Sequence, residues 1–464
     1  MHLKNAERQI TEGVIWKQLL TYFFPILLGT FFQQLYNTVD TIIVGRFVGT
    51  QALAAVGSTA ALISLLNGFF VGLSSGATVL VSQFFGGNDR KSVSEALHTG
   101  IGLSVILGGM VAALGILAGP TILKWMQTPE NCMEEATLYV VIFFSGAIAS
   151  MIYNMGAGIL RAMGDSGRPT LFLIVTCIVN VAGDLFFVLV LKMGVAGVAI
   201  ATVLAQTVSA LLVIFALRRL PEDICFRFRK VRISGNLLQR ILYIGIPAGL
   251  QFVTFDLANL LIQSGINSFG DTTVAAWTAY IKTDALTWMI SGAFGVSITT
   301  FVGQNFGAQK YDRIRKSVWV CMGMSVALVG AISAVLVCFR SVILGIYSND
   351  PEVIRMGASL MLWTVPFNFI FMPVEVFAGT MRGTGYSLAP TVITCLCVCV
   401  FRLAWLFIVV ARFHVVQMLA VCYPLSWVLA AVVFYIVYLR GNWLRKRIEA
   451  CGLRPEGKTS KEEA

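Results

Sequence analysis

Twelve apolar segments follow one another along the chain, and each is long enough to cross a lipid bilayer as a helix. Inside a bilayer only the protein can satisfy backbone N–H and C=O groups, so such segments form helices. Charged or glycine- and proline-rich stretches separate them. The expected spans are 14–38, 52–80, 92–118, 132–154, 168–190, 194–217, 237–266, 273–302, 314–338, 353–379, 387–410 and 415–439. The pattern predicts an all-α integral membrane protein with twelve transmembrane helices.

Glycine, proline and polar residues of the first half of the chain recur in the second half at an offset of about 221 residues. Arg161, Gly164, Ser166, Pro169 and Thr170 return as Arg382, Gly385, Ser387, Pro390 and Thr391. Six spans per half give both halves the same orientation, which predicts two parallel six-helix repeats. The expected parts are a cytoplasmic N-terminus (1–13), an N-lobe (14–217), a cytoplasmic linker (218–236), a C-lobe (237–440) and a basic cytoplasmic tail (441–464).

Lysine and arginine are divided unequally between the two sides of this topology. Of the 34 in the chain, 26 lie on the side of both termini, six lie on the other side and two lie within spans. Because cytoplasmic loops collect positive charge, both termini are expected in the cytoplasm and the protein in the plasma (inner) membrane. The net charge of +11 follows from this topology, so the lipid bilayer and not nucleic acid is the expected partner.

The chain shows none of the common signatures of an enzyme. It has no Walker A sequence and no His-Glu-x-x-His, and its three histidines are far apart. Its ten cysteines lie mostly inside apolar stretches, which is typical of unpaired core residues. We therefore expect no enzymatic activity, no cofactor and no metal site.

Ionisable residues within spans are costly and so are the natural functional candidates. In the first repeat these are Asp40 and Asp184, which lie roughly 9 to 12 Å inside the outer rim at 1.5 Å per residue. Two neighbouring carboxylates in a bundle cannot both ionise cheaply, so one is expected to hold a proton near neutral pH. Asn180 lies one turn before Asp184 on the same face. An ion-coupling site fits this pattern, and a plain ion pair between Asp40 and Arg46 is the alternative.

The second repeat carries a different set of charges. Its candidates are Asp256, Lys282, Asp284, Glu375 and Arg402. They fit either a structural network, with Lys282 and Arg402 neutralising the acids, or a second cation or substrate site. Asp40 and Asp184 correspond to Leu261 and Trp405, so the two halves share scaffolding but not these carboxylates.

Two further sets of residues bear on transport. Pro25 and Pro247 occupy matching places in the first and seventh spans and are expected to bend those helices. Soft and aromatic side chains could line an adaptable substrate cavity or could simply pack the core. These are Met151, Tyr153, Met155, Trp288 and Met289.

Several of these stretches together resemble the multidrug and toxic compound extrusion (MATE) family over nearly the whole chain. The stretches are Val39 to Arg46, the loops Gln83 to Gly86 and Gln304 to Gly307, and the turns Arg161 to Gly164 and Arg382 to Gly385. The resemblance implies a two-lobed exporter that exchanges H⁺ or Na⁺ for organic, often cationic, amphipathic compounds. It further implies an ion site at the positions of Asp40, Asn180 and Asp184, as in proton-linked bacterial members.

Sodium-linked members of that family also use acids on the seventh and tenth helices, and Asp256 and Glu375 look like these. Proton coupling is favoured and Na⁺ remains the alternative. We therefore expect a monomeric multidrug efflux antiporter that moves drug-like compounds by alternating access and contributes to antibiotic resistance.

Three rival hypotheses stay open. A flippase for lipid-linked oligosaccharides, from the same superfamily, would need a cavity rich in Arg and Lys. A membrane receptor or scaffold would show no solute-dependent ion flux. The six-plus-six major facilitator fold is the structural rival.

Overall fold

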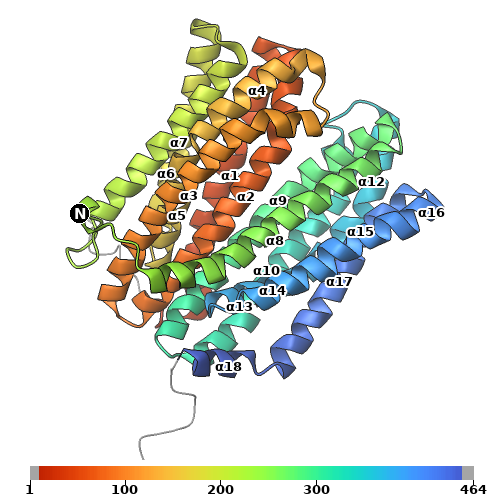
Figure 1. Ribbon diagram of the computed structural model, residues 1–464. Coiled ribbons are helices and arrows are strands. Elements are labelled where there is room, and N and C mark those ends of the chain that lie inside the picture. Colours follow the sequence, from red (N-terminus) through yellow and green to blue (C-terminus); the bar gives the residue numbers. More distant parts are fainter. Residues whose placement is uncertain (1–9, 452–464) are drawn as a thin grey trace, which may run out of the picture. The chain divides into compact units, whose positions relative to one another are not determined.

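The computed structural model describes residues 10–451, and almost all of them are helical, with no strand among them (Figure 1). The expected N-terminal residues 1–9 and tail residues 452–464 lie outside this range. The first half holds α1 (Ile15–Ile43), η2 (Val44–Val48), α2 (Thr50–Gly86), α3 (Arg90–Trp125), α4 (Glu130–Ser145), α5 (Ala147–Ala162), α6 (Gly167–Leu185), η3 (Phe186–Val190) and α7 (Gly194–Arg218). A short turn, η4 (Phe228–Lys230), lies in the connection to the second half.

The second half follows the same order. It holds α8 (Gly235–Asn267), α9 (Asp271–Gly307), α10 (Tyr311–Cys338), α11 (Arg340–Leu344), α12 (Pro351–Thr364), η5 (Val365–Ile370), α13 (Phe371–Gly383), α14 (Leu388–Thr394), η6 (Cys395–Val400), α15 (Phe401–Trp405), η7 (Leu406–Val410), α16 (Ala411–Phe413), α17 (Val416–Arg440) and α18 (Trp443–Ala450).

The structure confirms a multi-pass membrane protein. Within residues 10–451, eleven helices are long and apolar enough to cross a bilayer, and the bent pair α4 and α5 supplies a twelfth span. Large apolar side chains stand exposed on the helices, for example Leu117 and Ile346, each 78% exposed. Exposed apolar surface on this scale needs lipid as its solvent. The expected all-α fold with twelve transmembrane helices is therefore correct.

The two repeats share their irregularities as well as their helices. In the fourth span of the first repeat, α4 and α5 meet at a 46° bend around Gly146. In the matching span of the second repeat, the 3₁₀ turn η5 contains Pro366, which cannot donate a backbone hydrogen bond. A π-helical turn interrupts the fifth span in both repeats, as η3 and as η7. These breaks therefore belong to the duplicated frame.

By their contacts the residues form two units, and both units include a piece of the other repeat. Within residues 10–451, one unit comprises residue 10 and Phe24–Gly249, and the other comprises Thr11–Phe23 and residues 250–451. Helices α1 and α8 thus each begin in one unit and end in the other. Both remain helical through the expected bending points, Pro25 and Pro247, and the change of unit falls within two or three residues of each proline.

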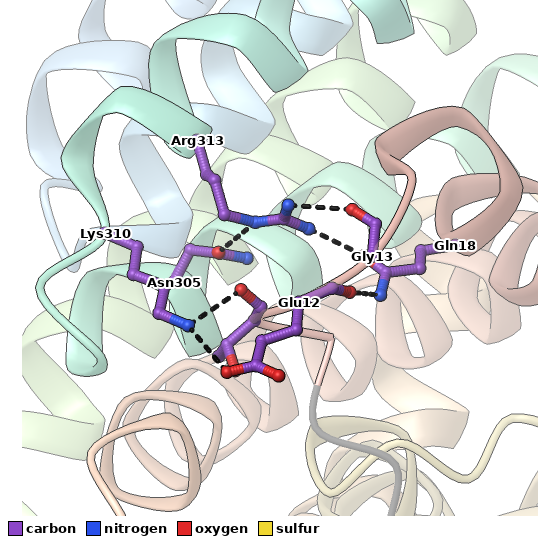
Figure 2. Close-up of polar contacts among 7 residues, drawn as sticks. Glu12, Gly13, Gln18, Asn305, Lys310 and Arg313 are labelled. Carbon is purple, nitrogen blue, oxygen red and sulfur yellow. Dashed lines mark hydrogen bonds and ion pairs between the residues drawn. The ribbon is translucent and has the colours of Figure 1, made fainter.

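Residues 11–18, which precede and open α1, are held within the second unit by side chains near the start of α10 (Figure 2). The Arg313 guanidinium donates to the Gly13 carbonyl (2.8 Å), the Gln18 amide oxygen (2.9 Å) and Asn305 Oδ1 (3.1 Å). Lys310 Nζ donates to the Thr11 carbonyl at 3.1 Å. Arg313 therefore ties the start of α1 to α9 and α10.

Replacing Arg313 by Gln is expected to loosen residues 11–18, because three hydrogen bonds disappear and the buried Asn305 side chain loses a donor. Hydrogen–deuterium exchange at these amides should rise severalfold. Arg315→Gln, on the same helix but exposed, is the matched control. Equal exchange in both variants would show that Arg313 does not hold this segment.

Glycines let α2 and the first part of α8 approach at backbone distance within the first unit. A Cβ added to Gly72 would overlap the backbone at Gly249, and one added to Gly76 would overlap the Ile241 carbonyl. Close helix approach through small residues is a common means of association in lipid. The start of α8 is thereby fixed against α2.

Gly76→Ala should lower the thermal midpoint of the purified protein, since the added methyl forces α2 and α8 apart at a cost of about 1–3 kcal/mol. Gly57→Ala on the same helix meets nothing within 4 Å and should be neutral or slightly stabilising. Fluorescence-detected thermal unfolding in detergent measures both. A midpoint for Gly76→Ala equal to that of Gly57→Ala would contradict the close packing.

Candidate functional site

The acidic residues of the first repeat lie at two helix ends in the first unit. Asp40 is in the last turn of α1 and Asp184 in the last turn of α6, and a π-helical turn follows each. Such turns are frequent at functional sites. The turn η3 recurs as η7 beside Trp405, so it is common to both repeats, whereas α8 shows no π-helical turn after Leu261 that would correspond to η2.

The structure brings Asp40, Asn180 and Asp184 together. Asp40 lies within interaction distance of Asp184, Asn180 and Thr202, so α1, α6 and α7 all contribute. The Asn180 and Asp184 side chains have no exposed surface, and Asp40 is 8% exposed. Arg46 is exposed and makes no ion pair with Asp40 in the described chain. The side chains of Asp40, Asn180 and Asp184 thus lie together, and we call these three residues the Asp40 cluster.

Although these side chains approach one another, most polar atoms of the Asp40 cluster make no hydrogen bond of good geometry with a described residue. This holds for both oxygens of Asp184, both amide atoms of Asn180 and Asp40 Oδ1. Leaving a buried polar group unpaired costs about 1–3 kcal/mol. A shared proton between the carboxylates, or a small hard cation among these oxygen atoms, would satisfy them. Across residues 10–451 no group of three His, Cys, Asp or Glu residues could hold a metal ion.

Two further residues beside the Asp40 cluster were not predicted from the sequence. Tyr139 on α4 lies close to Asp40, Asp184 and Thr202. The Thr202 hydroxyl donates to the Val198 carbonyl one turn earlier at 3.0 Å, which leaves its lone pairs free to accept. In sequence, a tyrosine and a threonine in apolar helices look like ordinary packing residues.

In the second repeat, Asp284 on α9 is buried and well satisfied. Its carboxylate accepts a hydrogen bond from Trp288 Nε1 at 2.8 Å and one from Asn368 Nδ2 at 2.6 Å. Asn368 belongs to the turn η5, so this contact fixes the interrupted tenth span against α9. Asp284 thus differs from Asp184, whose oxygens lack partners.

Glu375 on α13 is balanced by a residue outside the predicted set. Arg382 Nη2 lies 3.3 Å from Glu375 Oε1. A Cβ on Gly295 of α9 would overlap this carboxylate, so the glycine makes room for the ion pair. Arg382 is expected from the sequence in a loop turn, but it lies in the last turn of α13 and is only 8% exposed.

Arg402 on α15 is enclosed by aromatic rings. Its guanidinium lies 4.0 Å from the Tyr423 ring centroid, and its Nε donates to Ser426 Oγ at 3.0 Å. The residue is 1% exposed, and Nη2 has no partner in the described chain. A buried guanidinium stacked on rings gains cation–π stabilisation, and the ion-pair partner of Glu375 is Arg382 and not Arg402.

The remaining candidates are dispersed. Lys282 is exposed and Asp256 is half-buried. Met151 and Met155 are fully buried in the core of the first unit, and Tyr153 donates its hydroxyl to the Pro169 carbonyl at 3.2 Å. In the second unit, Trp288 binds Asp284 and Met289 is half-buried.

Comparison with known proteins detects the duplication independently. The model of the family described as MatE matches twice, at residues 25–186 and 247–408. The two matches begin at the two repeat-related prolines, Pro25 and Pro247.

Curated relatives match along almost their whole length. The "Probable multidrug resistance protein YoeA" of Bacillus subtilis (strain 168) is 26% identical over 445 residues, which cover 94% of this chain and 95% of the relative. The "Probable multidrug resistance protein NorM" of Thermotoga maritima is 23% identical over 452 residues, covering 94% of each.

Solved structures share the fold. An outward-facing multidrug resistance MATE family transporter of the MOP superfamily superposes with a TM-score of 0.87 at 22% identity, covering 96% of this chain and 98% of that one. A MOP superfamily transporter from Pyrococcus furiosus, described as having a binding pocket of reverse polarity, gives a TM-score of 0.87 at 21% identity with the same coverage.

Replacing Asn180 by Leu should stabilise the protein, because a buried amide without partners gives way to an apolar side chain of similar size, a gain of about 1 kcal/mol or more. The thermal midpoint in detergent should rise by a few degrees. Asn154→Leu is the control, since Asn154 donates to the Ser150 carbonyl at 2.9 Å and its loss should not stabilise. Equal shifts in both variants would refute the unpaired state of Asn180.

Proposed function

The chain belongs to the MatE family of membrane transporters, and from this membership we propose that it is a multidrug efflux antiporter that exchanges organic, often cationic compounds for a coupling ion. The relatives' names support the substrate class. One observation supports the antiport step: in the buried Asp40 cluster, both oxygens of Asp184, both amide atoms of Asn180 and one oxygen of Asp40 have no hydrogen bond of good geometry within the described chain.

The Asp40 cluster can couple ion and substrate through charge alone. A carboxylate attracts a cation at about 4 Å by about 4 kcal/mol when the effective dielectric constant is about 20. Protonating that carboxylate removes the attraction, which corresponds to about a thousandfold in affinity. Protonation of Asp40 and Asp184 from the outer side therefore releases a cationic compound, and deprotonation toward the cytoplasm restores the site. The duplicated helices supply two similar halves for alternating access.

We favour the proton as the coupling ion because two carboxylates in contact can share one. Sodium is the other candidate, since Asn180, Thr202 and Tyr139 add oxygen atoms around the carboxylates. The second repeat gives less support to an ion site, because Asp284 and Glu375 already have partners. We propose further that the protein acts in the plasma membrane with both termini in the cytoplasm.

Counter-transport in proteoliposomes tests this function. An imposed proton gradient is expected to drive a fluorescent organic cation across the membrane in the wild type. Asp40→Asn and Asp184→Asn should each slow this flux by about tenfold or more, since each removes an ionisable carboxyl from the pair. Asp271→Asn, at an exposed position at the start of α9, is the matched control and should leave the flux unchanged.

A sodium gradient imposed separately identifies the ion. Flux driven by sodium and not by protons would assign Na⁺ to the site, whereas flux driven by neither gradient would refute antiport. Full activity in Asp40→Asn and Asp184→Asn would remove the Asp40 cluster from the mechanism.

A further inference from the structure

A cavity of about 790 Å³ lies in the first unit between the start of α3 and the connection from α7 to α8. Its lining includes four basic side chains, Lys91, Arg229, Lys230 and Arg232. The acids in the lining are Asp223, which pairs with Arg90 at 3.0 Å, and Glu95. The cavity therefore has an excess of positive charge.

Three of these cations form no ion pair within the part of the chain that the structure describes. Arg229, Lys230 and Arg232 are exposed and form no ion pair within residues 10–451, while Lys91 lies near Asp89. A general accumulation of positive charge in cytoplasmic loops requires only that such residues face solvent. These basic side chains also line one cavity, which that tendency does not require. Like charges close together repel one another, and a bound anion would reduce this repulsion.

The connection is fixed in place by side chains of α3. His98 Nε2 accepts a hydrogen bond from the Arg227 backbone N–H at 3.1 Å, and His98 Nδ1 lies 2.7 Å from the Ser94 carbonyl. Thr99 Oγ1 donates to the Arg232 carbonyl at 3.3 Å and accepts from the Ser234 N–H at 3.4 Å.

Both ends of the segment that carries Arg229 and Lys230 are thus bound to α3. The two basic residues also belong to the 3₁₀ turn η4, so their backbone is already ordered. A preorganised loop loses little further entropy when a ligand binds.

Apolar side chains alternate with these cations. Phe228 is 65% exposed, Val231 37% and Ile233 40%. Val231 and Ile233 pack over Gly102 of α3, where a Cβ would lie only 3.2 Å from Val231 Cγ1. Since α3 is a membrane helix, the basic cavity and the start of the lipid-facing surface adjoin. Basic and apolar side chains interleaved beside a membrane helix suit the headgroup region of an anionic leaflet.

We propose that this cavity binds the phosphate group of an anionic lipid headgroup. Ser94 and Ser234 add hydroxyl groups to the lining, and Arg229 and Arg232 offer paired N–H donors that match phosphate oxygens. Phe228, Val231 and Ile233 contact the acyl region, which a soluble phosphate compound lacks. The site is independent of the Asp40 cluster and of the proposed transport.

Native mass spectrometry of the purified full-length chain, titrated with phosphatidylglycerol or phosphatidylcholine, tests the site. The wild type is expected to bind phosphatidylglycerol more tightly than phosphatidylcholine. Lys230→Gln combined with Arg232→Gln should weaken phosphatidylglycerol binding by about tenfold. Arg315→Gln combined with Lys316→Gln removes the same two charge types from exposed positions on α10 and should have no such effect.

A positioning role for Thr99 provides a second variant with unchanged charge. Thr99→Val should weaken phosphatidylglycerol binding because the connection loses its attachment at Arg232 and Ser234, and Thr99→Ser should restore it. Equal binding of the two lipids, equal losses in the two double variants, or no loss in Lys230→Gln with Arg232→Gln would overturn the proposal. Soluble glycerol phosphate competing as strongly as phosphatidylglycerol would assign the cavity to a soluble phosphate and overturn the lipid assignment.

Discussion

A bilayer interior offers no hydrogen-bond partner, so each polar side chain in a membrane helix must find its partner within the protein. Most buried polar residues of this chain do so in simple ways: Asp284 accepts two hydrogen bonds, and Thr283 donates to the carbonyl one turn earlier. The Asp40 cluster stands apart because five of its polar atoms have no partner in the described chain. The unpaired polar atoms of this cluster lower the stability of the folded protein. Such a loss of stability is expected at a site that binds and releases an ion during its function.

The two repeats share their helix interruptions but differ in the polar residues beside them. Both repeats interrupt their fourth and fifth spans at matching places, through Gly146 and η5 and through η3 and η7. The helix interruptions therefore correspond between the repeats, but the polar side chains next to them differ. The first repeat places a carboxylate before each of its two π turns, Asp40 before η2 and Asp184 before η3, whereas the second repeat has Trp405 before η7, with its indole N–H bound to the Met418 carbonyl. A transporter needs two similar halves to move, but only one ion site to couple the movement.

Local signals in the sequence predicted the spans well, because a membrane helix is defined by the hydropathy of its own residues. The fourth span shows where this fails: it was expected at 132–154, but α5 continues to Ala162 and includes Arg161, whose charge was taken as a loop signal. Tyr139 and Thr202 could not be singled out, since their role depends on neighbours contributed by other helices. The attachment of residues 11–18 to Arg313 joins positions about 300 apart in the chain, and no local sequence pattern predicts such a contact.

Helix α1 is divided between the two contact units, and this division suggests how a change of charge at Asp40 could act in the proposed transport cycle. Arg313 holds the segment at the start of this helix within the second unit, and Asp40 near its end belongs to the first. Pro25 follows the change of unit and removes one backbone hydrogen bond, so the helix is weakest there. The Pro25 carbonyl accepts a hydrogen bond from the Thr170 hydroxyl of α6, the helix that also carries Asn180 and Asp184. A change of charge at Asp40 therefore acts on a helix whose two ends are fixed in different units and whose compliant point lies between them.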